Sequence, residues 1–140
     1  MILSYSKPSF KADILAGIKK HTLREDIHNR WKPGMKIHHW MHNPRNVKKN
    51  PHEFMINHCT SIQEVIIKRE IVPYSSHACV GSMQIIVDGT PIENWMELIN
   101  NDGLTYTEFQ DWFVPLNEFP DKTVKAEWIG KIIHWTDLKY

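Results

Sequence analysis

Cysteine is scarce in this chain, because Cys59 and Cys79 are the only two among 140 residues. Two cysteines do not provide the disulfide framework of a small secreted domain. Long apolar runs are lacking as well, since none approaches the roughly 18 residues of a membrane-spanning helix. The N-terminus also lacks the charged and then apolar pattern of a secretion signal. These absences predict a cytoplasmic protein that does not contact a membrane.

Metal-binding motifs are also lacking, although the chain has nine histidines. No CxxC or HExxH pattern occurs, and a zinc site needs three or four ligands that converge on one point. On a strand, His38 and His42 would share a face with Trp40, whereas His39 would point the other way. Two further histidines follow at His52 and His58. We therefore expect exposed or half-buried histidines on a strand, and neither a metal ion nor another cofactor.

The length and composition indicate one globular domain that covers residues 1–140. A chain of this size can bury a core without a disulfide or a metal. The hydrophobic share of 41% and the charged share of 24% are typical of globular proteins. The net charge of +1 conceals an asymmetry, because residues 1–50 carry eleven Lys or Arg against three acids, and residues 91–140 carry four Lys against nine acids. Either the basic part binds an anionic partner such as nucleic acid, or the two parts neutralise each other across the fold.

The periodicity of apolar residues predicts a strand-rich chain with helices at two places. Alternation and β-branched residues predict strands within residues 2–5, 35–42, 54–71, 82–89 and 122–135. Helical stripes predict one early helix within residues 9–17 and two adjacent late helices within residues 90–103 and 105–115. The basic, proline-containing segment 43–53 is expected to be an exposed loop. The predicted fold is α+β, a small barrel or curled sheet with these helices packed on it.

Capping signals set the expected ends of two of these helices. Ser9 is a good N-cap for the first helix, and Gly17 is a good C-terminal signal. For the second helix, Thr90 is expected as the N-cap, with Pro91 at the first helical position and Glu93 completing a capping box.

Polar side chains are concentrated in the segment Ile14–Asp26, directly after the expected end of the first helix. Lys19 and Lys20 there would be stabilised by the helix macrodipole, but Thr22 and Arg24 lie too far along for that explanation. A lysine beside a hydroxyl can also act as a base with its nucleophile, provided that its pKa is lowered by burial or by neighbouring cations. Lys19 and Thr22 share a face at a helical period but not at a strand period.

Trp31 lies between two cations, Arg30 and Lys32. An aromatic ring in such a setting can stack on a nucleic-acid base, and it can equally well pack in the core. Both interpretations of Trp31 stay open from the sequence.

Two blocks of the sequence resemble the ASCH domain family, which is related to PUA-like barrels. The first block contains Gly17, Lys19, Thr22 and Arg24 within "ILAGIKKHTLR", followed by Gly34 in "RWKPGMKIH". The second block, "NNDGLTYTEFQDWF", resembles the family's acidic residue at a helix end and the short aromatic helix after it. The resemblance spans residues 9–38 and 90–113.

The resemblance implies a small PUA-like β-barrel with helices around it and a cleft beside the lysine–threonine motif. The family is thought to bind RNA or nucleotide-like ligands in this cleft, and some small members hydrolyse the amide of N4-acetylcytidine. Carried over, Lys19 would activate the nucleophile, Thr22 would attack the acyl carbon, and Asp102 would donate a proton to the leaving amine. Arg24 would orient the ligand or hold Asp102. This chain departs from that group by an aspartate in place of glutamate, an inserted basic loop at residues 43–57, and a greater length.

Two functions therefore compete at this point. The chain is a binding module for RNA or for a nucleotide or nucleoside, with Arg24 and Trp31 at the ligand. The basic residues that would assist are Arg30, Lys32, Arg45, Lys48 and Lys49. Alternatively, the chain is an amidohydrolase of an acylated nucleoside that uses Lys19, Thr22 and Asp102. A third possibility, a protein–protein module on the same fold, would leave the motif unexplained.

Overall fold

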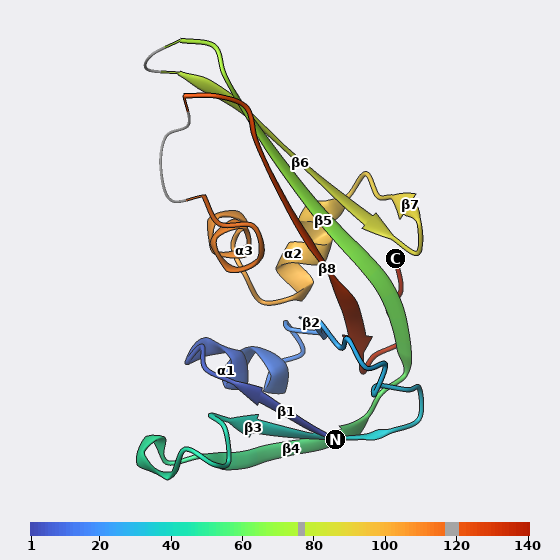
Figure 1. Cartoon of the computed structure of the whole chain (residues 1–140). Helices are drawn as coiled ribbons and strands as arrows, with labels where there is room; N and C mark the ends of the chain where they lie inside the picture. Colours follow the sequence, from blue (N-terminus) through green and yellow to red (C-terminus); the bar gives the residue numbers. More distant parts are fainter. Residues whose placement is uncertain (76–77, 117–120) are drawn as a thin grey trace.

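The computed structural model describes residues 1–75, 78–116 and 121–140, which form two β-sheets and three α-helices. The first sheet has the strand order β1-β3-β4, with β1 parallel to β3 and β3 antiparallel to β4. Its strands are β1 (Ile2–Tyr5), β3 (Lys36–Met41) and β4 (His52–His58). A short 3₁₀ helix, η1 (Val47–Lys49), lies in the connection between β3 and β4. Figure 1 shows this sheet at the bottom of the molecule, with α1 above it.

The second sheet is antiparallel and has the strand order β2-β8-β5-β6-β7. Its strands are β2 (His21–Arg24), β5 (Ser61–Pro73), β6 (Cys79–Val87), β7 (Thr90–Pro91) and β8 (Val124–His134). The helices are α1 (Ser9–Leu15), α2 (Trp95–Asn101) and α3 (Tyr106–Phe113). In Figure 1, α2 and α3 lie beside the long β5 and β8 strands, and β2 crosses the space between them and α1.

The predicted α+β class is confirmed, as are its early helix and two adjacent late helices. Among the described residues the strands pair as two separate sheets, and no set of ladders closes them into a barrel. None of the helices in these ranges is long and apolar enough to cross a membrane. Nor does this part of the chain bring three or more His, Cys, Asp or Glu side chains together as metal ligands.

The predicted start of the second helix is wrong. Thr90 and Pro91 pair with Val87 and Ile86 as strand β7, and α2 begins at Trp95. The reason is the preceding turn, since Asp88 and Gly89 both have positive φ angles of 49° and 81°. An Asp-Gly pair in this conformation closes a two-residue β-hairpin. The hairpin therefore takes the residues that the capping pattern had assigned to the helix.

The ends of the first helix are confirmed in part. Gly17 has a positive φ of 76° beyond the end of α1, as expected of a helix-terminating glycine. The N-cap position is Pro8 rather than Ser9, and no side chain caps the helix start. Phe10 and Ile14 of α1 are buried, whereas Leu15 at the end of the helix is exposed.

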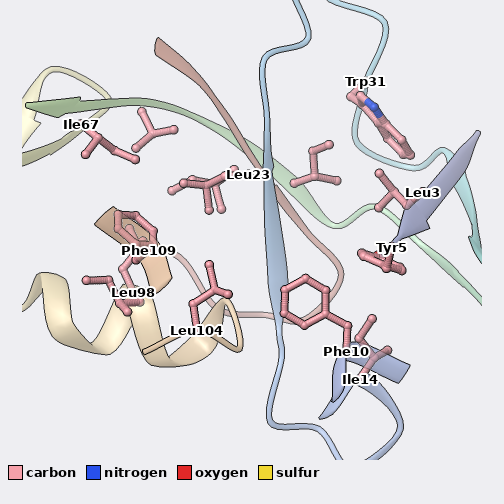
Figure 2. Close-up of a cluster of buried hydrophobic side chains, with 14 of the residues drawn as sticks. Leu3, Tyr5, Phe10, Ile14, Leu23, Trp31, Ile67, Leu98, Leu104 and Phe109 are labelled. Carbon is pink, nitrogen blue, oxygen red and sulfur yellow. The ribbon is translucent and has the colours of Figure 1, made fainter. Parts of the chain in front are cut away.

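The core fills the space between the two sheets and the helices. Figure 2 shows Leu23 of β2 near its centre, with Leu98 and Phe109 from α2 and α3 on one side and Tyr5 and Phe10 on the other. Burying one large apolar side chain stabilises the fold by about 1.5–3 kcal/mol. Strand β2 is thus held by apolar contacts on both sides, and its polar residues are fixed relative to α1 and α2.

Candidate functional site

The centre of the site is a buried ion pair between Lys19 and Asp102. The Lys19 Nζ atom lies 2.7 Å from Asp102 Oδ1 and donates a second hydrogen bond of 2.6 Å to the Asp102 backbone oxygen. The two residues are only 1% and 2% exposed. Asp102 is the residue at the C-terminal cap of α2, where carbonyl oxygens favour a cation. Two elements far apart in the sequence therefore meet at one charged contact.

Backbone contacts hold the two segments of this pair together. The Lys20 N–H donates to the Asn101 backbone oxygen at 2.7 Å, which fixes the segment after α1 to the end of α2. Gly103 follows Asp102 with a φ of 76°, and a Cβ there would lie 3.3 Å from the Phe10 ring and 3.4 Å from the Lys19 side chain. The Phe10 ring itself lies 4.3 Å from Lys19 Nζ and covers the ammonium group.

Burial and charge shift the pKa of both partners. Burial lowers the pKa of the Lys19 ammonium below its ordinary value, although Asp102 opposes this effect. Burial alone would raise the pKa of the Asp102 carboxyl, but Lys19 and His21 outweigh it and hold that pKa below its ordinary value. Asp102 is therefore a carboxylate, and Lys19 is an amine that releases its proton more readily than an exposed lysine does.

This ion pair borders a small cavity of about 110 Å³. Thr22 and Arg24 of β2 line the same cavity, as do aromatic residues from three elements, among them Phe10 and Trp112. The predicted catalytic residues Lys19, Thr22 and Asp102 are thus brought to one cavity. The Thr22 side chain has no hydrogen-bond partner among the described residues, and it is not hydrogen-bonded to Lys19.

The side chain of Arg24 contacts strand β1. Its Nη2 atom donates to the Ser4 backbone oxygen at 2.8 Å, and its guanidinium lies 5.6 Å from the centre of the Tyr5 ring. The Nε–H of Arg24 is buried and has no partner in the described structure. Within these residues, Arg24 forms no ion pair with Asp102, so of its two expected roles the orientation of a ligand is the one its contacts favour.

Four further predicted ligand residues do not line this cavity. Trp31 is 6% exposed and belongs to the hydrophobic core, so no open indole face is available there for a base. Arg30 and Lys32 are exposed on the segment before β3, and Arg45 is exposed in the connection between β3 and β4. None of the four lines the cavity beside Lys19.

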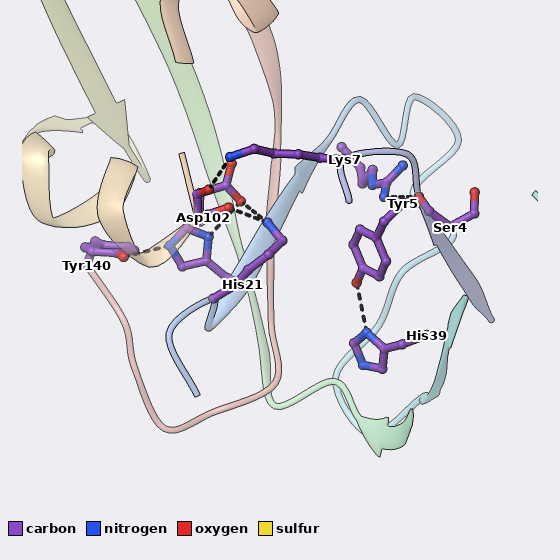
Figure 3. A network of polar contacts seen from close by, with 10 residues as sticks. Ser4, Tyr5, Lys7, His21, His39, Asp102 and Tyr140 are labelled. Atoms are coloured by element: carbon purple, nitrogen blue, oxygen red, sulfur yellow. Dashed lines mark hydrogen bonds and ion pairs between the residues drawn. The ribbon is translucent and has the colours of Figure 1, made fainter. Parts of the chain in front are cut away.

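The sequence did not predict the chain of polar groups that lies behind Asp102 and includes His21. The His21 Nδ1 atom lies 3.6 Å from Asp102 Oδ1, and its Nε2 atom is 2.7 Å from the Tyr140 hydroxyl. Asn101 Nδ2 donates to the same hydroxyl at 3.0 Å. Figure 3 shows His21 between Asp102 and Tyr140. No spacing in the sequence relates Tyr140 to this site, because the contact depends on the path of the chain after β8.

Two further buried histidines make hydrogen bonds outside this chain of groups, although the His134 ring packs against the rings of His21 and Tyr140 at centroid distances of 5.3 and 5.8 Å. His134 Nε2 donates to Gln63 Oε1 at 2.9 Å, and burial lowers the pKa of His134 to about 3. His39 contacts the Tyr5 hydroxyl at 2.8 Å and Asn57 Oδ1 at 2.7 Å, and burial lowers its pKa as well. Figure 3 shows the contact between Tyr5 and His39. The expectation that the histidines are exposed or half-buried is therefore wrong for His39, which is completely buried.

Comparison with protein-family models, curated proteins and solved structures gave no match for this chain.

Proposed function

We propose that the chain is an ASCH-like, PUA-related protein that binds a nucleoside or nucleotide, free or within RNA, in the cavity beside Lys19. The observation that carries this proposal is the buried Lys19–Asp102 ion pair at the wall of a cavity. A buried ion pair contributes little to stability relative to apolar residues of the same size. Strongly shifted titratable groups beside a cavity are instead typical of functional sites.

The groups around the cavity indicate what kind of ligand it takes. The Arg24 Nε–H is buried and has no partner among the described residues. The Thr22 hydroxyl lines the same cavity and makes no hydrogen bond to those residues either. A buried polar group that lacks a partner costs about 1–3 kcal/mol, so a ligand oxygen or ring nitrogen that accepts from it contributes to binding. Phe10 and Trp112 supply apolar walls against which a flat ring can pack. A pyrimidine-type base satisfies both requirements.

Equilibrium binding of the four ribonucleosides, their monophosphates and short oligoribonucleotides tests this proposal by calorimetry. We expect Arg24→Gln to weaken binding roughly tenfold or more, because it removes a charged donor. Lys20→Gln is the matched control, since Lys20 is adjacent to Lys19 but does not line the cavity. Absence of binding by all of these probes, or equal loss in both variants, would contradict the proposal.

A second candidate function is hydrolysis of an N4-acylated cytidine-type nucleoside. The observation that favours it is the lowered pKa of Lys19 together with a Thr22 hydroxyl in the same cavity that makes no hydrogen bond to the described residues. The neutral Lys19 amine would take the Thr22 proton while Thr22 Oγ1 bonds to the acyl carbon. The C–N bond would then break, the Lys19 proton would pass to the leaving amine, and water would hydrolyse the acyl-threonine ester.

The role of Asp102 in this second candidate differs from the expected one. A carboxyl whose pKa is held below its ordinary value is ionised at neutral pH and carries no proton to donate. Asp102 is therefore better suited to position Lys19, and Lys19 to return the proton to the amine. Because Lys19 and Thr22 are not hydrogen-bonded here, this route requires that the two side chains approach each other when substrate binds.

Incubation with N4-acetylcytidine, followed by chromatography for cytidine, separates the two candidates. If the chain is a hydrolase, the native chain and Lys20→Gln should both form cytidine, and Thr22→Val should not. If N4-acetylcytidine binds but no cytidine forms, the binding function stands and the hydrolase function is contradicted.

A further inference from the structure

A second hollow adjoins the cavity beside Lys19. It has a volume of about 260 Å³ and shares Ser4, Tyr5 and Ser6 with that cavity. Its other wall is the connection between β3 and β4, which contributes His42, Asn43, Asn46 and Lys49. A ligand that passes across Ser4–Ser6 would therefore contact both the Lys19 site and this connecting loop.

The loop wall is held in place by backbone contacts. The His42 N–H donates to the Tyr5 backbone oxygen at 2.8 Å, which ties the start of the loop to the end of β1. Asn43 accepts from the Arg45 N–H through Oδ1 at 2.9 Å and from the Asn46 N–H through its backbone oxygen at 2.8 Å. The polar groups of this wall consequently lie at a fixed position relative to Tyr5.

The electrostatic character of this wall is positive. The sequence has no Asp or Glu from Ile27 to His52, and the loop itself carries Arg45, Lys48 and Lys49. Lys49 and Asn46 are exposed, and their side chains have no ion pair or hydrogen bond among the described residues. A cation and an amide that lack partners in the described part of the chain, at the edge of a hollow, are suited to an anionic ligand group.

The volumes of the two hollows suit a single ligand that places one part in each hollow. The 110 Å³ cavity is well below the roughly 300–1,000 Å³ typical of sites that enclose a drug-sized ligand, so it holds only part of such a molecule. We infer that the hollow lined by Asn46 and Lys49 binds the phosphate of a nucleotide whose base lies beside Lys19 and Arg24. This inference rests on the proposed function and narrows its ligand to a phosphorylated nucleoside, either a mononucleotide or a phosphodiester of RNA.

The test compares Lys49→Gln with Lys48→Gln in the full chain. Lys48 is the preceding residue in η1 and has the same charge, but it does not line the hollow. Calorimetry measures the contribution of phosphate to affinity. The probes are cytidine, cytidine monophosphate and a short cytidine oligoribonucleotide without a terminal phosphate. The corresponding compounds of the other three bases are tested in the same way. We expect the phosphate to increase affinity at least about tenfold, as for one charge-assisted contact. Lys49→Gln should remove most of this gain and leave nucleoside affinity unchanged, and Lys48→Gln should retain the gain.

The three probes also identify the source of the phosphate. A gain for the monophosphate alone assigns a mononucleotide, and a gain for the oligonucleotide assigns RNA. Equal affinity for cytidine and both phosphorylated probes, or equal loss in both variants, overturns the inference.

Failure of the proposed function is distinguishable from failure of the phosphate subsite. If no nucleoside or nucleotide binds, inorganic phosphate is titrated and followed by amide NMR shifts. Shifts at Asn46 and Lys49 that vanish in Lys49→Gln but persist in Lys48→Gln support the subsite without the base site. No shifts at these amides overturn it.

Discussion

The energetic role of the Lys19–Asp102 pair is decided at the scale of single residues. Removing two charges from water costs several kcal/mol for each ion, and their attraction returns this only with good geometry. The two contacts of Lys19 Nζ, at 2.7 and 2.6 Å, provide that geometry. Replacing one partner leaves the other as an unpaired buried charge, whereas replacing both leaves no buried charge from this pair.

We predict that Lys19→Met lowers the free energy of unfolding by roughly 3–5 kcal/mol, because Asp102 then lacks its partner. The double variant Lys19→Met/Asp102→Leu should be more stable than this single variant and should still fail to bind ligand. Urea unfolding with a double-mutant cycle measures the coupling. A double variant as unstable as the sum of the two single variants would show that the two charges do not compensate each other in the folded chain.

Acid sensitivity is also a property of single residues. Burial lowers the pKa of His134 to about 3, so this side chain is neutral in the folded chain at mildly acidic pH. Burial also lowers the pKa of His21 and His39 below the ordinary value. An unfolded histidine has a pKa of about 6.5. Below that pH the unfolded chain binds protons that the folded chain does not, so stability falls as the pH decreases from about 6.5 toward 3.

We predict that His134→Gln reduces the pH dependence of the free energy of unfolding between about pH 6.5 and 4.5. Glutamine keeps an N–H donor for Gln63 Oε1 but has no proton to gain. His28→Gln, at an exposed position, is the control. Chemical denaturation at a series of pH values gives the slope, and an unchanged slope in His134→Gln would contradict this account.

Single residues also mark the limit of what the sequence could predict about the site. Lys19, Thr22, Arg24 and Asp102 lie in two sequence blocks with recognisable spacing, and the structure brings all four to one cavity. The partners of His21 were not predictable, because Tyr140 reaches it through the path of the chain after β8. Trp31 between two cations was compatible with an exposed ring, but packing against the core decided its position.

At the scale of elements, turn chemistry had more influence than capping patterns. The Asp88-Gly89 turn extended β6 into a hairpin with Thr90 and Pro91, and thereby delayed the start of α2. In α3, by contrast, Thr105 and Glu108 form the reciprocal capping box that such residues favour. Local signals therefore predicted element type well and predicted boundaries only where no neighbouring turn competed.

A comparison of two glycines at helix ends distinguishes the cost of backbone strain from the cost of a steric clash. Gly17 and Gly103 both have a φ of 76°, but a Cβ at Gly17 would meet nothing within 4 Å. We predict that Gly17→Ala destabilises by about 1 kcal/mol, from the left-handed backbone alone. Gly103→Ala should cost more and should weaken ligand binding, because its Cβ would press on Phe10 and Lys19.

Thermal unfolding and calorimetry of the two glycine variants measure these effects. Equal stability losses in Gly17→Ala and Gly103→Ala, with ligand binding intact, would show that the close approach at Gly103 does not shape the site.

At the scale of the whole molecule, the site depends on segments from both ends of the chain. Residues of β1, α1 and β2 form one side, the end of α2 and α3 form the other, and Tyr140 supports His21 from behind. The α+β class followed from the strand and helix pattern. The division into two sheets did not, because periodicity identifies strands without identifying which strands pair.

We predict that Tyr140→Phe lowers the free energy of unfolding by about 1–3 kcal/mol, because His21 Nε2 and Asn101 Nδ2 lose their shared partner. Leu138→Ala, in the same tail, is a control for general loosening of the C-terminal segment. Hydrogen exchange at the amides of residues 19–22 should increase in Tyr140→Phe and not in Leu138→Ala. Unchanged exchange at these amides in Tyr140→Phe would show that the tail does not support the site.

The position of Trp112 has a practical consequence. Its indole is half-exposed, lies 6.0 Å from the Phe10 ring, and belongs to the lining of the cavity beside Lys19. The other five tryptophans are not part of that lining in the described structure. Occupation of the cavity should therefore change the emission of this one fluorophore, and Trp112→Phe should abolish the change. The chain carries its own optical reporter, with which unlabelled compounds can be screened in solution.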